Sequence, residues 1–538
     1  MSFRTHISVL DKAATLHASR PVFRVPKLKH DSEQVEEWDT VTYSRFASDV
    51  ERYAKYWTKL LDGIALRSVV ALWLGGMTYI DVLHIYGIFK AGFIPQLFSL
   101  RLPNPDVVNE LLQKAGAKAL IYDPSYESAA PTFSVPVYPA PFTELPDVDD
   151  VVLPSTSFTP TDDDVAMVFH TSGSTSGSPK LVRCTYKWLD CIVSKGYIFS
   201  IPKDEARQDV TVWMGSMCHI GQTCMLIGSL QHGSCVIQPT KIAFSSDELI
   251  DMITRCGLNR LNQFATFLAT HLKHSRQDAK LLALMQGLDE VLYSGLALAA
   301  EEERWAYEKG IRLTNLFGNT ECGAMLLSVG GNGPDARWLR PIPGTDYGFF
   351  PIADGTEGDA PANANAQLCE LVILAQSGDC PDAALRAADG HYHTGDLFQA
   401  APGPAGAGAW VARGRNDDWI KSENSLRCDT RAIEDNVRQT CGDLVEHCVV
   451  VGNGRPSPAL FVEARAGLAP EQVRRDILRR TRHFHARRYL HERVTAPELV
   501  FVVAPGTLPR TATKGNIRRR AVEDKFQAEL DKAYGVRS

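Results

Sequence analysis

A segment near residue 170 combines residue types that together bind anions. The apolar run 165–169 leads into residues 171–180, where Ser, Thr and Gly dominate before a final Pro-Lys pair. Glycines let backbone amides approach an anion, hydroxyls donate further hydrogen bonds, and a lysine adds positive charge. We therefore predict a loop that holds the β- and γ-phosphates of a nucleotide. Its candidate contacts are Thr171, Ser172, Gly173, Ser174, Thr175, Gly177 and Lys180.

Three other readings of this loop fit the residues less well. A Walker loop needs four residues between its first glycine and a Gly-Lys-Ser/Thr end, whereas Lys180 follows a Ser-Pro pair. A nucleophile elbow needs a central serine in Gly-x-Ser-x-Gly, and the residue midway between Gly173 and Gly177 is Thr175. A flexible linker rarely follows an apolar strand and ends in Pro-Lys.

The elements that must position this loop alternate between helix and strand. Helical spacing of apolar residues covers 43–60 and 79–91, and short apolar runs predict strands at 68–74 and 117–123. The rhythm continues with predicted strands at 165–169, 235–238, 260–264 and 290–294. Such alternation favours α/β layering around a largely parallel sheet.

The last part of the chain has an α/β pattern of its own. It comprises predicted helices at 430–437 and 471–488 and strands at 446–451, 459–463 and 498–503. Residues 415–538 carry 23 Lys and Arg against 17 Asp and Glu, a net charge of +6, so the rest carries −12. We therefore expect two domains, 1–414 and 415–538, of which the basic one suits an anionic ligand. Segments 361–366 and 400–409 read as a loop and a hairpin tip.

Length and composition narrow the function classes. A chain of 538 residues exceeds one compact core, and 44% hydrophobic with 22% charged residues is ordinary globular composition. The net charge of −6 argues against a general nucleic-acid binder. The 12 cysteines form no Cys-x-x-Cys pair, and neither a signal peptide nor an 18-residue apolar run occurs. We expect a cytoplasmic enzyme without nucleic-acid or membrane partners.

The phosphate loop resembles that of the ANL superfamily of adenylate-forming enzymes, which includes acyl-CoA synthetases, adenylation domains of peptide synthetases and luciferases. The resemblance extends over nearly the whole chain. It implies a large N-terminal domain of stacked α/β subdomains and a small mobile α+β C-terminal domain. Between them these domains would enclose ATP, Mg²⁺ and a small carboxylic acid, and the product would be an acyl-AMP.

Residues 315–321 resemble the aromatic-Gly-x-Thr-Glu motif of this superfamily. An aromatic face can stack on adenine, and a carboxylate can hold magnesium that bridges phosphates. The resemblance assigns stacking to Phe317, the α-phosphate contact to Thr320 and the metal to Glu321. Further nucleotide candidates in and near this motif are Asn315, Leu316, Gly318 and Gly295.

Three later motifs complete the resemblance. Residues 392–397 present Asp396 to the ribose hydroxyls, and residues 412–421 resemble the interdomain hinge. There Arg415 would reach the ribose or a phosphate, and Asp417 would be the pivot. Residues 508–517 carry Lys514, the candidate catalytic lysine, in a Lys-Gly order similar to fungal synthetase-like adenylation enzymes. Its cation would neutralise charge in the transition state.

The acyl pocket is expected around residues 217–221, which resemble the aromatic gate of the family. His219 stands at the gating place and is counted among the catalytic candidates. Most pocket candidates are apolar, which favours an aryl, short or medium acyl acid over an amino acid. These candidates are Met217, Cys218, His219, Thr266, Phe267, Leu296 and Met325.

The acyl acceptor stays open at this point. The chain ends 24 residues after Lys514, so we expect a free acceptor rather than an attached carrier or reductase domain. CoA leads, and the alternatives are the phosphopantetheine of a separate carrier protein or an amine that forms an amide. The basic cluster 474–488 could face CoA phosphates or an acidic carrier, or simply face solvent. A catalytically inactive nucleotide-binding scaffold and a luciferase-like oxidation are the rival functions.

Overall fold

The computed structural model describes residues 3–535 except 31, 33, 100–101, 143–144, 155–157, 172–179, 334, 353–367, 417–418, 422–426, 487, 489 and 511–516. For residues 421, 427 and 490 it describes the backbone alone.

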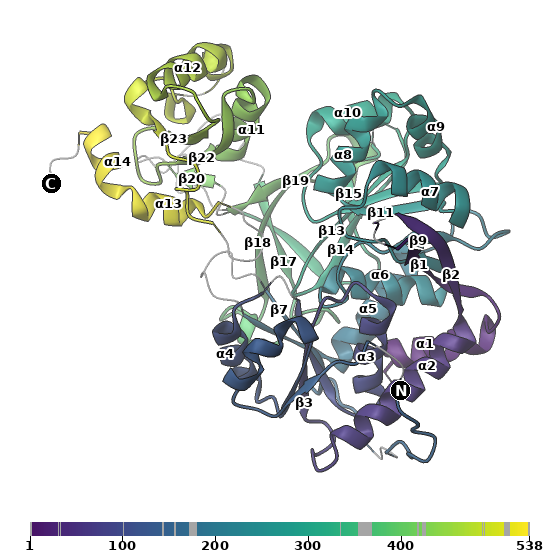
Figure 1. Ribbon diagram of the computed structural model, residues 1–538. Coiled ribbons are helices and arrows are strands. Elements are labelled where there is room, and N and C mark those ends of the chain that lie inside the picture. Colours follow the sequence, from purple (N-terminus) through teal and green to yellow (C-terminus); the bar gives the residue numbers. More distant parts are fainter. Residues whose placement is uncertain are drawn as a thin grey trace.

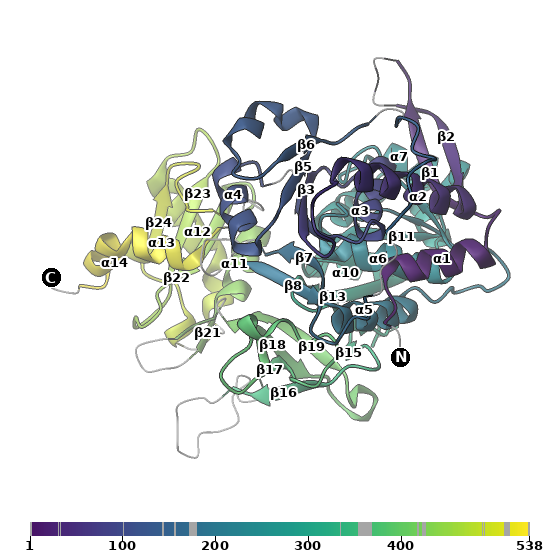
Figure 2. The same cartoon turned by 90° about the horizontal axis from the view of Figure 1, so that it is seen from below.

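A six-stranded sheet carries the base of the predicted phosphate loop (Figure 2). Its order is β6-β5-β3-β4-β7-β8, and all pairs are parallel except β7 with β8. The strands are β3 (Val69–Leu74), β4 (Ile94–Ser99), β5 (Ala119–Tyr122), β6 (Val137–Pro139), β7 (Val165–His170) and β8 (Leu181–Thr185). Crossover helices between the parallel strands produce the α/β alternation that the sequence predicts.

A 13-stranded mixed sheet runs beside it in the order β16-β17-β18-β19-β15-β14-β13-β12-β11-β9-β10-β1-β2. The pairs from β1 through β10, β9, β11 and β12 to β13 are parallel, and the pairs from β13 to β16 are antiparallel. The strands are β1 (Pro21–Leu28), β2 (Val35–Thr42), β9 (Val210–Val212), β10 (Cys235–Ile237), β11 (Arg260–Phe264), β12 (Glu290–Ser294), β13 (Leu313–Asn319), β14 (Gly323–Ser328), β15 (Leu339–Pro341), β16 (Tyr347–Pro351), β17 (Leu368–Ile373), β18 (Tyr392–Ala400) and β19 (Trp410–Arg415).

Helices cover these sheets, and several begin at threonine or aspartate caps that satisfy free backbone amides. Helices α3, α5 and α6 contribute many fully buried residues to the largest core. The helices before residue 310 are α1 (His6–Leu16), α2 (Tyr43–Leu60), α3 (Tyr79–Lys90), α4 (Pro105–Ala115), α5 (Tyr186–Phe199), α6 (Ile220–Gln231), α7 (Ser246–Cys256), α8 (Ala265–Ser275), α9 (Ala279–Gly287) and α10 (Ala300–Glu308).

The C-terminal part, yellow-green to yellow in Figure 1, forms its own hydrophobic core from residues between 420 and 534. A three-stranded sheet of β22 (Val445–Val451), β23 (Ala459–Ala464) and β24 (Val500–Val503) lies at its centre. A hairpin of β20 (Trp419–Lys421) and β21 (Arg427–Asp429) precedes it. The helices are α11 (Thr430–Cys441), α12 (Pro470–Ala486), α13 (Arg519–Lys525) and α14 (Gln527–Ala533).

The predicted fold class is confirmed, since a large α/β part is followed by a smaller α+β part. The expectation of a largely parallel sheet holds for the six-stranded sheet and for one half of the larger one. The other half is antiparallel because hairpins join its strands, and segment 400–409 is the connection between β18 and β19. Segment 361–366 lies outside the described residues.

Candidate active site

Thr320 and Glu321 lie in the tight turn between β13 and β14. The side chain of Asn319 accepts a hydrogen bond from the Cys322 amide at 2.8 Å and closes this turn. Glycine is required on both sides: a Cβ on Gly318 would stand 2.3 Å from the Gly323 carbonyl oxygen, and Gly323 has φ +69°. Figure 1 shows β13 and β14 near the middle of the molecule. The sequence motif therefore becomes a rigid hairpin turn with two polar side chains.

The Glu321 carboxylate suits a magnesium ion. Its side chain is half-buried, and no hydrogen bond or ion pair to it occurs among the residues that the structure describes. Magnesium keeps several waters and takes one or two carboxylates together with substrate phosphates, so a single carboxylate meets its need. The described residues hold no group of three or more His, Cys, Asp or Glu side chains placed to bind a metal by themselves. A metal here would thus be shared with the nucleotide.

Asp396 and Arg415 meet across neighbouring strands. They are partners in the β18–β19 register, and the Arg415 guanidinium donates to the Asp396 carboxylate at 3.2 Å. Asp396 is buried, whereas Arg415 is partly exposed. Gly395 has φ +71° and its amide donates to Glu370 at 3.0 Å. Both Gly395 and Asp396 lie inside β18, just before a shift in the β18–β19 register, so the predicted glycine turn is an irregular stretch of strand. Adjacent strands thus present an acid and a base at one place.

Tyr392 shows that these motifs come together in space. Burial raises the pKa of Tyr392, and the neighbouring charges of Glu321 and Asp396 raise it further, whereas Arg415 lowers it. One tyrosine therefore lies within electrostatic reach of residues from three motifs that together span about a hundred positions of the sequence. The residues predicted to contact the metal, the ribose and a phosphate therefore lie in one region of the molecule.

Only the two ends of the predicted phosphate loop are described. The Thr171 amide donates to the Lys180 carbonyl at 3.0 Å, and the Lys180 amide approaches the Thr171 hydroxyl at 3.4 Å. These contacts close the loop at the end of the β7–β8 pair, and the Lys180 side chain is exposed. Residues 172–179, with Ser172, Gly173, Ser174, Thr175 and Gly177, lie outside the described residues.

His170 anchors the start of this loop as a neutral side chain. Its ring stacks on Phe98 with centroids 4.2 Å apart, and burial lowers its pKa to about 4. Gln96 donates to its Nε2, so Nδ1 carries the proton and donates to the Leu97 carbonyl at 2.9 Å. The histidine therefore fixes the loop base to β4 without adding charge.

The predicted adenine side lies at the ends of parallel strands. The Ser294 hydroxyl donates to the Leu316 carbonyl at 2.6 Å, and the Asn315 amide is bonded to Ser328 at 2.8 Å. Phe317 is half-buried and packs edge-on against Phe398 of β18, with ring centroids 5.2 Å apart. These contacts link the strand that carries Phe317 to the strand that carries Asp396.

Gly295 makes a turn at the end of β12 that only glycine tolerates easily. Its φ is +88°, and a Cβ would meet the Phe264 ring at 3.0 Å. The same ring would stand 3.0 Å from a Cβ on Gly215. Two glycines therefore make room for one aromatic side chain at the end of β11, and that aromatic was not predicted.

His219 caps the start of α6. Its Nδ1 accepts a hydrogen bond from the Gly221 amide at 3.1 Å, so Nε2 carries the proton in the neutral ring. The ring lies edge-on to Phe264 with centroids 6.4 Å apart, and Phe264 lies 6.5 Å from Phe267. His219, Phe264 and Phe267 thus form one aromatic group.

The remaining predicted pocket residues differ in exposure. Met217 and Cys218 are buried in the largest core, and burial raises the pKa of the Cys218 thiol to about 12. Thr266 and Leu296 are exposed, Leu296 at 59%. Met325 is fully buried in a different core, together with Cys322 and Phe398. The aromatic group around His219 is therefore the better defined part of the predicted pocket.

The catalytic lysine and the hinge lie outside the described residues: Lys514 falls within 511–516, and Asp417 within 417–418. Their roles stay predictions. Within the described part of the chain, no helix is both long and apolar enough to cross a membrane.

Two family models match the chain. One, described as AMP-binding enzyme, covers residues 11–354, and one described as AMP-binding enzyme C-terminal domain covers residues 417–538. The AMP-binding domain-containing enzyme iboA of Amanita muscaria (strain Koide BX008) is 37% identical over 94% of this chain and 98% of the relative. Adenylate-forming reductase Nps10 of Heterobasidion annosum is 22% identical over 86% of this chain and 43% of the relative.

Solved structures share the fold at low identity. O-succinylbenzoate coenzyme A synthetase of Bacillus subtilis in complex with AMP has a TM-score of 0.73 at 16% identity, over 97% of this chain and 99% of that chain. The anthranilate CoA ligase AuaEII with anthranoyl-AMP has a TM-score of 0.72 at 17% identity, over 99% of each chain. The motifs, their convergence around Tyr392 and the family match agree: this chain belongs to the AMP-binding enzyme family, within the ANL superfamily of adenylate-forming enzymes.

Proposed function

We propose that the protein activates a small carboxylic acid as its acyl-AMP and then transfers the acyl group to a thiol, which we take to be that of CoA. In the first step a carboxylate oxygen attacks the α-phosphorus of ATP, the bond to the β-phosphate breaks, and pyrophosphate leaves. In the second step the thiol sulfur attacks the acyl carbonyl, the thiol proton is lost, and AMP leaves. No general base is needed in the first step, since carboxylic acids are ionised at neutral pH.

The observation that supports this proposal is the contact between Asp396 and Arg415 on neighbouring strands, with Glu321 close enough for its charge to act on Tyr392 of β18. Glu321 would hold a magnesium ion, which neutralises the charge of the leaving pyrophosphate. Thr320 would bind the α-phosphate, Asp396 the ribose hydroxyls, and Phe317 the adenine. The residues between Thr171 and Lys180 would bind the outer phosphates. These groups position the reactants and neutralise charge, which is most of what phosphoryl transfer requires.

The C-terminal part would supply the last charge. We propose a boundary at residues 414 and 415, rotation about Asp417, and Lys514 as the cation that bridges the carboxylate and the α-phosphate. The separate core of residues 420–534 supports a unit that can move as a whole. The 12 free cysteines suit a reducing compartment, so we place the enzyme in the cytoplasm.

The acid would bind beside the aromatic group of His219, Phe264 and Phe267. The aromatic rings of this group and the apolar side chains of Met217 and Met325 favour an aryl or short acyl acid. Neutral His219 could donate from Nε2 to an oxygen of the bound acid, because Nδ1 is already an acceptor.

A panel of carboxylic acids tests this proposal, read by pyrophosphate release with and without CoA. We expect acid-dependent release that CoA accelerates. Lys514→Ala should lower it about 10²–10³-fold, as loss of a preorganised charge does. No release with any acid would favour the inactive scaffold, and acid-dependent oxygen uptake would favour a luciferase-like oxidation.

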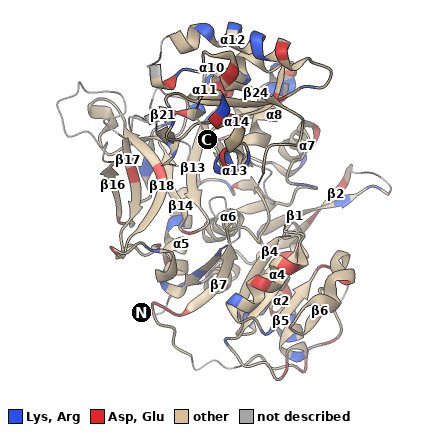
Figure 3. Cartoon of the chain, turned by 90° about the vertical axis from the view of Figure 1, so that its left-hand side faces the viewer, with Lys and Arg blue, Asp and Glu red and all other residues tan. Residues whose placement is uncertain are grey.

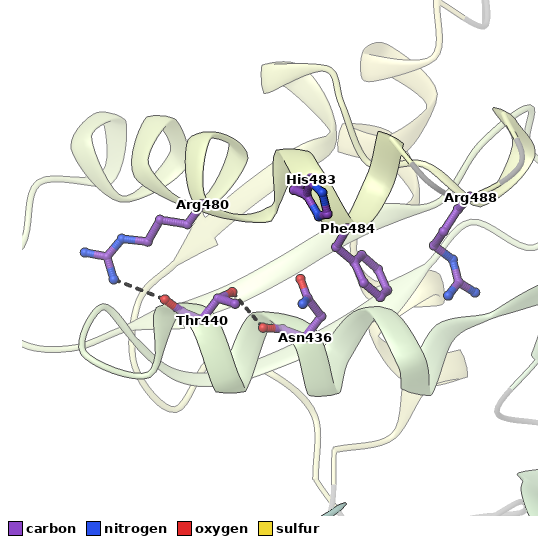
Figure 4. A pocket seen from close by; sticks show the side chains of 6 residues that line it. All are labelled: Asn436, Thr440, Arg480, His483, Phe484 and Arg488. Atoms are coloured by element: carbon purple, nitrogen blue, oxygen red, sulfur yellow. Dashed lines mark hydrogen bonds between the residues drawn. The ribbon is translucent and has the colours of Figure 1, made fainter. Parts of the chain in front are cut away.

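A carrier protein is the second candidate acceptor, favoured by the basic face of α12 (Figure 3). Arg475, Arg479 and Arg482 are exposed on this helix. Beside them α11 and α12 enclose an open hollow of about 420 Å³ (Figure 4), lined by Asn436, Thr440, Arg480, His483, Phe484 and Arg488. Such a face suits an acidic partner as well as a CoA phosphate.

Two side chains in this hollow retain unused polar atoms. Asn436 Oδ1 and Arg488 Nε are buried, and neither has a hydrogen-bond partner among the described residues. Both arginines also have an acidic partner, since Arg480 is paired with Asp443 and the guanidinium end of Arg488 with Glu492. Arg482→Ser/Arg488→Ser should therefore raise the KM for the acceptor and leave the pyrophosphate step unchanged, with Lys12→Ser on α1 as the control. Comparing CoA, a phosphopantetheinylated carrier and an amine as acceptors decides between the alternatives.

A further inference from the structure

One face of α5 supports the turn that carries Thr320 and Glu321. Trp188, Ile192 and Lys195 are spaced four and three residues apart, so they lie on the same side of the helix. The Trp188 indole donates to the Glu321 carbonyl at 3.0 Å, and the Lys195 ammonium donates to the Cys322 carbonyl at 2.7 Å. Ile192 packs between them against Gly323. Side chains of α5 thus hold two consecutive carbonyls of the turn, those of Glu321 and Cys322.

Lys195 is buried to an unusual degree for its type. Its side chain is 1% exposed and forms an ion pair at 2.7 Å with Asp379, which is 0% exposed. Burial by itself would lower the pKa of Lys195, but the charge of Asp379 overcomes this and raises it. A buried ion pair rarely stabilises a fold more than apolar residues of the same size would. A gain in folding stability alone therefore does not explain why Lys195 and Asp379 are buried as an ion pair.

Asp379 extends the contact to the small antiparallel strands. Its carboxylate accepts hydrogen bonds from the Tyr347 hydroxyl of β16 and from the Ser377 hydroxyl, the latter at 2.5 Å. Asp379 lies between β17 and β18, 17 residues before Asp396. A Cβ on neighbouring Gly378 would stand 3.0 Å from the Cys191 Cβ, so this segment lies directly against α5.

We propose that Lys195 and Asp379 are positioning residues for adenylation, which fix the Thr320–Glu321 turn relative to the strand that carries Asp396. This inference rests on the proposed roles of Glu321 and Asp396. The ion pair touches neither nucleotide nor acid. It joins helix α5, the Cys322 carbonyl and the β16–β18 strands, and so sets the distance between the metal contact and the ribose contact.

The chain contains a matched ion pair away from this turn. Asp209 is also 0% exposed and pairs with buried Arg260 at 3.0 Å, while its other oxygen accepts from Asn259. Asp379→Asn and Asp209→Asn therefore make the same change, removal of a buried carboxylate charge with no change in shape. Arg260 keeps a second buried carboxylate, Glu290 at 2.5 Å, so the two stability losses can differ. A difference in Mg²⁺ dependence reports position.

The test measures ATP binding by calorimetry over a range of Mg²⁺ concentrations, together with the melting temperature of each variant. Both Asn variants should lose stability. Mg²⁺ should increase the ATP affinity of the wild type, and only Asp379→Asn should reduce this increase. We expect the reduction to be about tenfold, which is the effect of losing one charge-assisted contact. Glu321→Gln serves as the reference for complete loss of that gain. If Asp379→Asn does not fold, Lys195→Met/Asp379→Asn removes both charges and leaves none unpaired.

A purely structural role would give the opposite pattern. Asp379→Asn, or the double variant, would then melt at a lower temperature and keep the wild-type Mg²⁺ dependence, as Asp209→Asn does, and the proposal would be wrong. ATP binding can be measured without the acid substrate. This outcome is therefore distinguishable from failure of the acid panel, which would contradict only the proposed function.

Discussion

A hairpin turn and an irregular stretch of strand β18 each present an acidic side chain to the proposed nucleotide site, and they are held in different ways. The Thr320–Glu321 turn rests on Trp188 and on a lysine that solvent does not reach. The Gly395–Asp396 stretch of β18 is held by Glu370, whose other carboxylate oxygen contacts His393 at 3.2 Å. His393 is 41% exposed. The first support is sealed from solvent, whereas the second reaches it, so the two halves of one site should respond differently to pH and to mutation.

Glu321→Gln should have the largest effect. It removes the charge that would hold magnesium and leaves both carbonyl contacts to α5 intact. We expect the rate of acid-dependent ATP–pyrophosphate exchange to fall about 10²–10³-fold, with little change in melting temperature. Glu308→Gln, at an exposed position on α10, is the control. An exchange rate within twofold of wild type would remove Glu321 from the metal role.

Asp396→Asn should weaken binding of the ATP ribose and leave metal binding unchanged. The change weakens hydrogen bonds to the ribose hydroxyls and breaks the ion pair with Arg415, which implies about a tenfold to hundredfold higher KM for ATP. The wild-type enzyme should prefer ATP over 2′-deoxyATP, and the variant should lose most of this preference. Equal preference in both proteins would show that Asp396 does not bind the ribose.

Alanine substitutions at two glycines should affect the stability of the two segments differently. Gly323 and Gly395 both have positive φ, +69° and +71°. A Cβ on Gly323 would stand 2.7 Å from the Ile192 side chain in the core, whereas on Gly395 it would meet only the flexible end of Arg415 at 3.2 Å. We expect a loss in the free energy of unfolding of about 3 kcal/mol for Gly323→Ala and about 1 kcal/mol for Gly395→Ala. Denaturant unfolding measures both, and equal losses would contradict the distinction.

His393 should give the smallest effect, visible as pH dependence. Hydrogen bonds to Asp389 and then Glu370 raise the pKa of His393 above its ordinary value. A raised pKa in the folded state contributes stability that is complete below about pH 6.5 and is lost as pH rises through the folded value. The melting temperature of His393→Gln should therefore lie below that of wild type at pH 5–6 and approach it at pH 8–9. Solvent screening keeps the difference small.

A constant difference across this pH range would show that the histidine acts through packing. The same series with Asp379→Asn should show no such convergence, because Asp379 raises the pKa of Lys195 and burial raises the pKa of the neighbouring Cys191 and Cys322 thiols, which keeps them uncharged over this range.

The sequence predicted elements well where the local pattern decides them. Helix α2 begins and ends at the predicted residues 43 and 60, and β11 and β12 coincide with their predicted strands. Apolar periodicity suffices there because each element buries one face or both. Glu321, Asp396 and Arg415 could be named as candidates from their neighbours in the chain, and their roles stay predictions.

The supports of the site could not be predicted. Lys195 lies in a helix whose polar residues are normally exposed, and its partner Asp379 is 184 residues away. Phe264 was predicted only as the end of a strand, because nothing local shows that Gly215 and Gly295 leave room for its ring. Such contacts arise from how strands and helices assemble, and a single sequence does not encode them in spacing.

Cys322 allows the opening rate of the rigid turn to be measured by thiol labelling. Its thiol is fully buried one residue beyond Glu321, and burial raises its pKa well above the ordinary value. Thiol reagents attack the thiolate, so a maleimide can label this cysteine only after the hairpin opens. The labelling half-time of the peptide that contains Cys322, followed by mass spectrometry, therefore reports how often the β13–β14 hairpin opens. A bound nucleotide should lengthen this half-time.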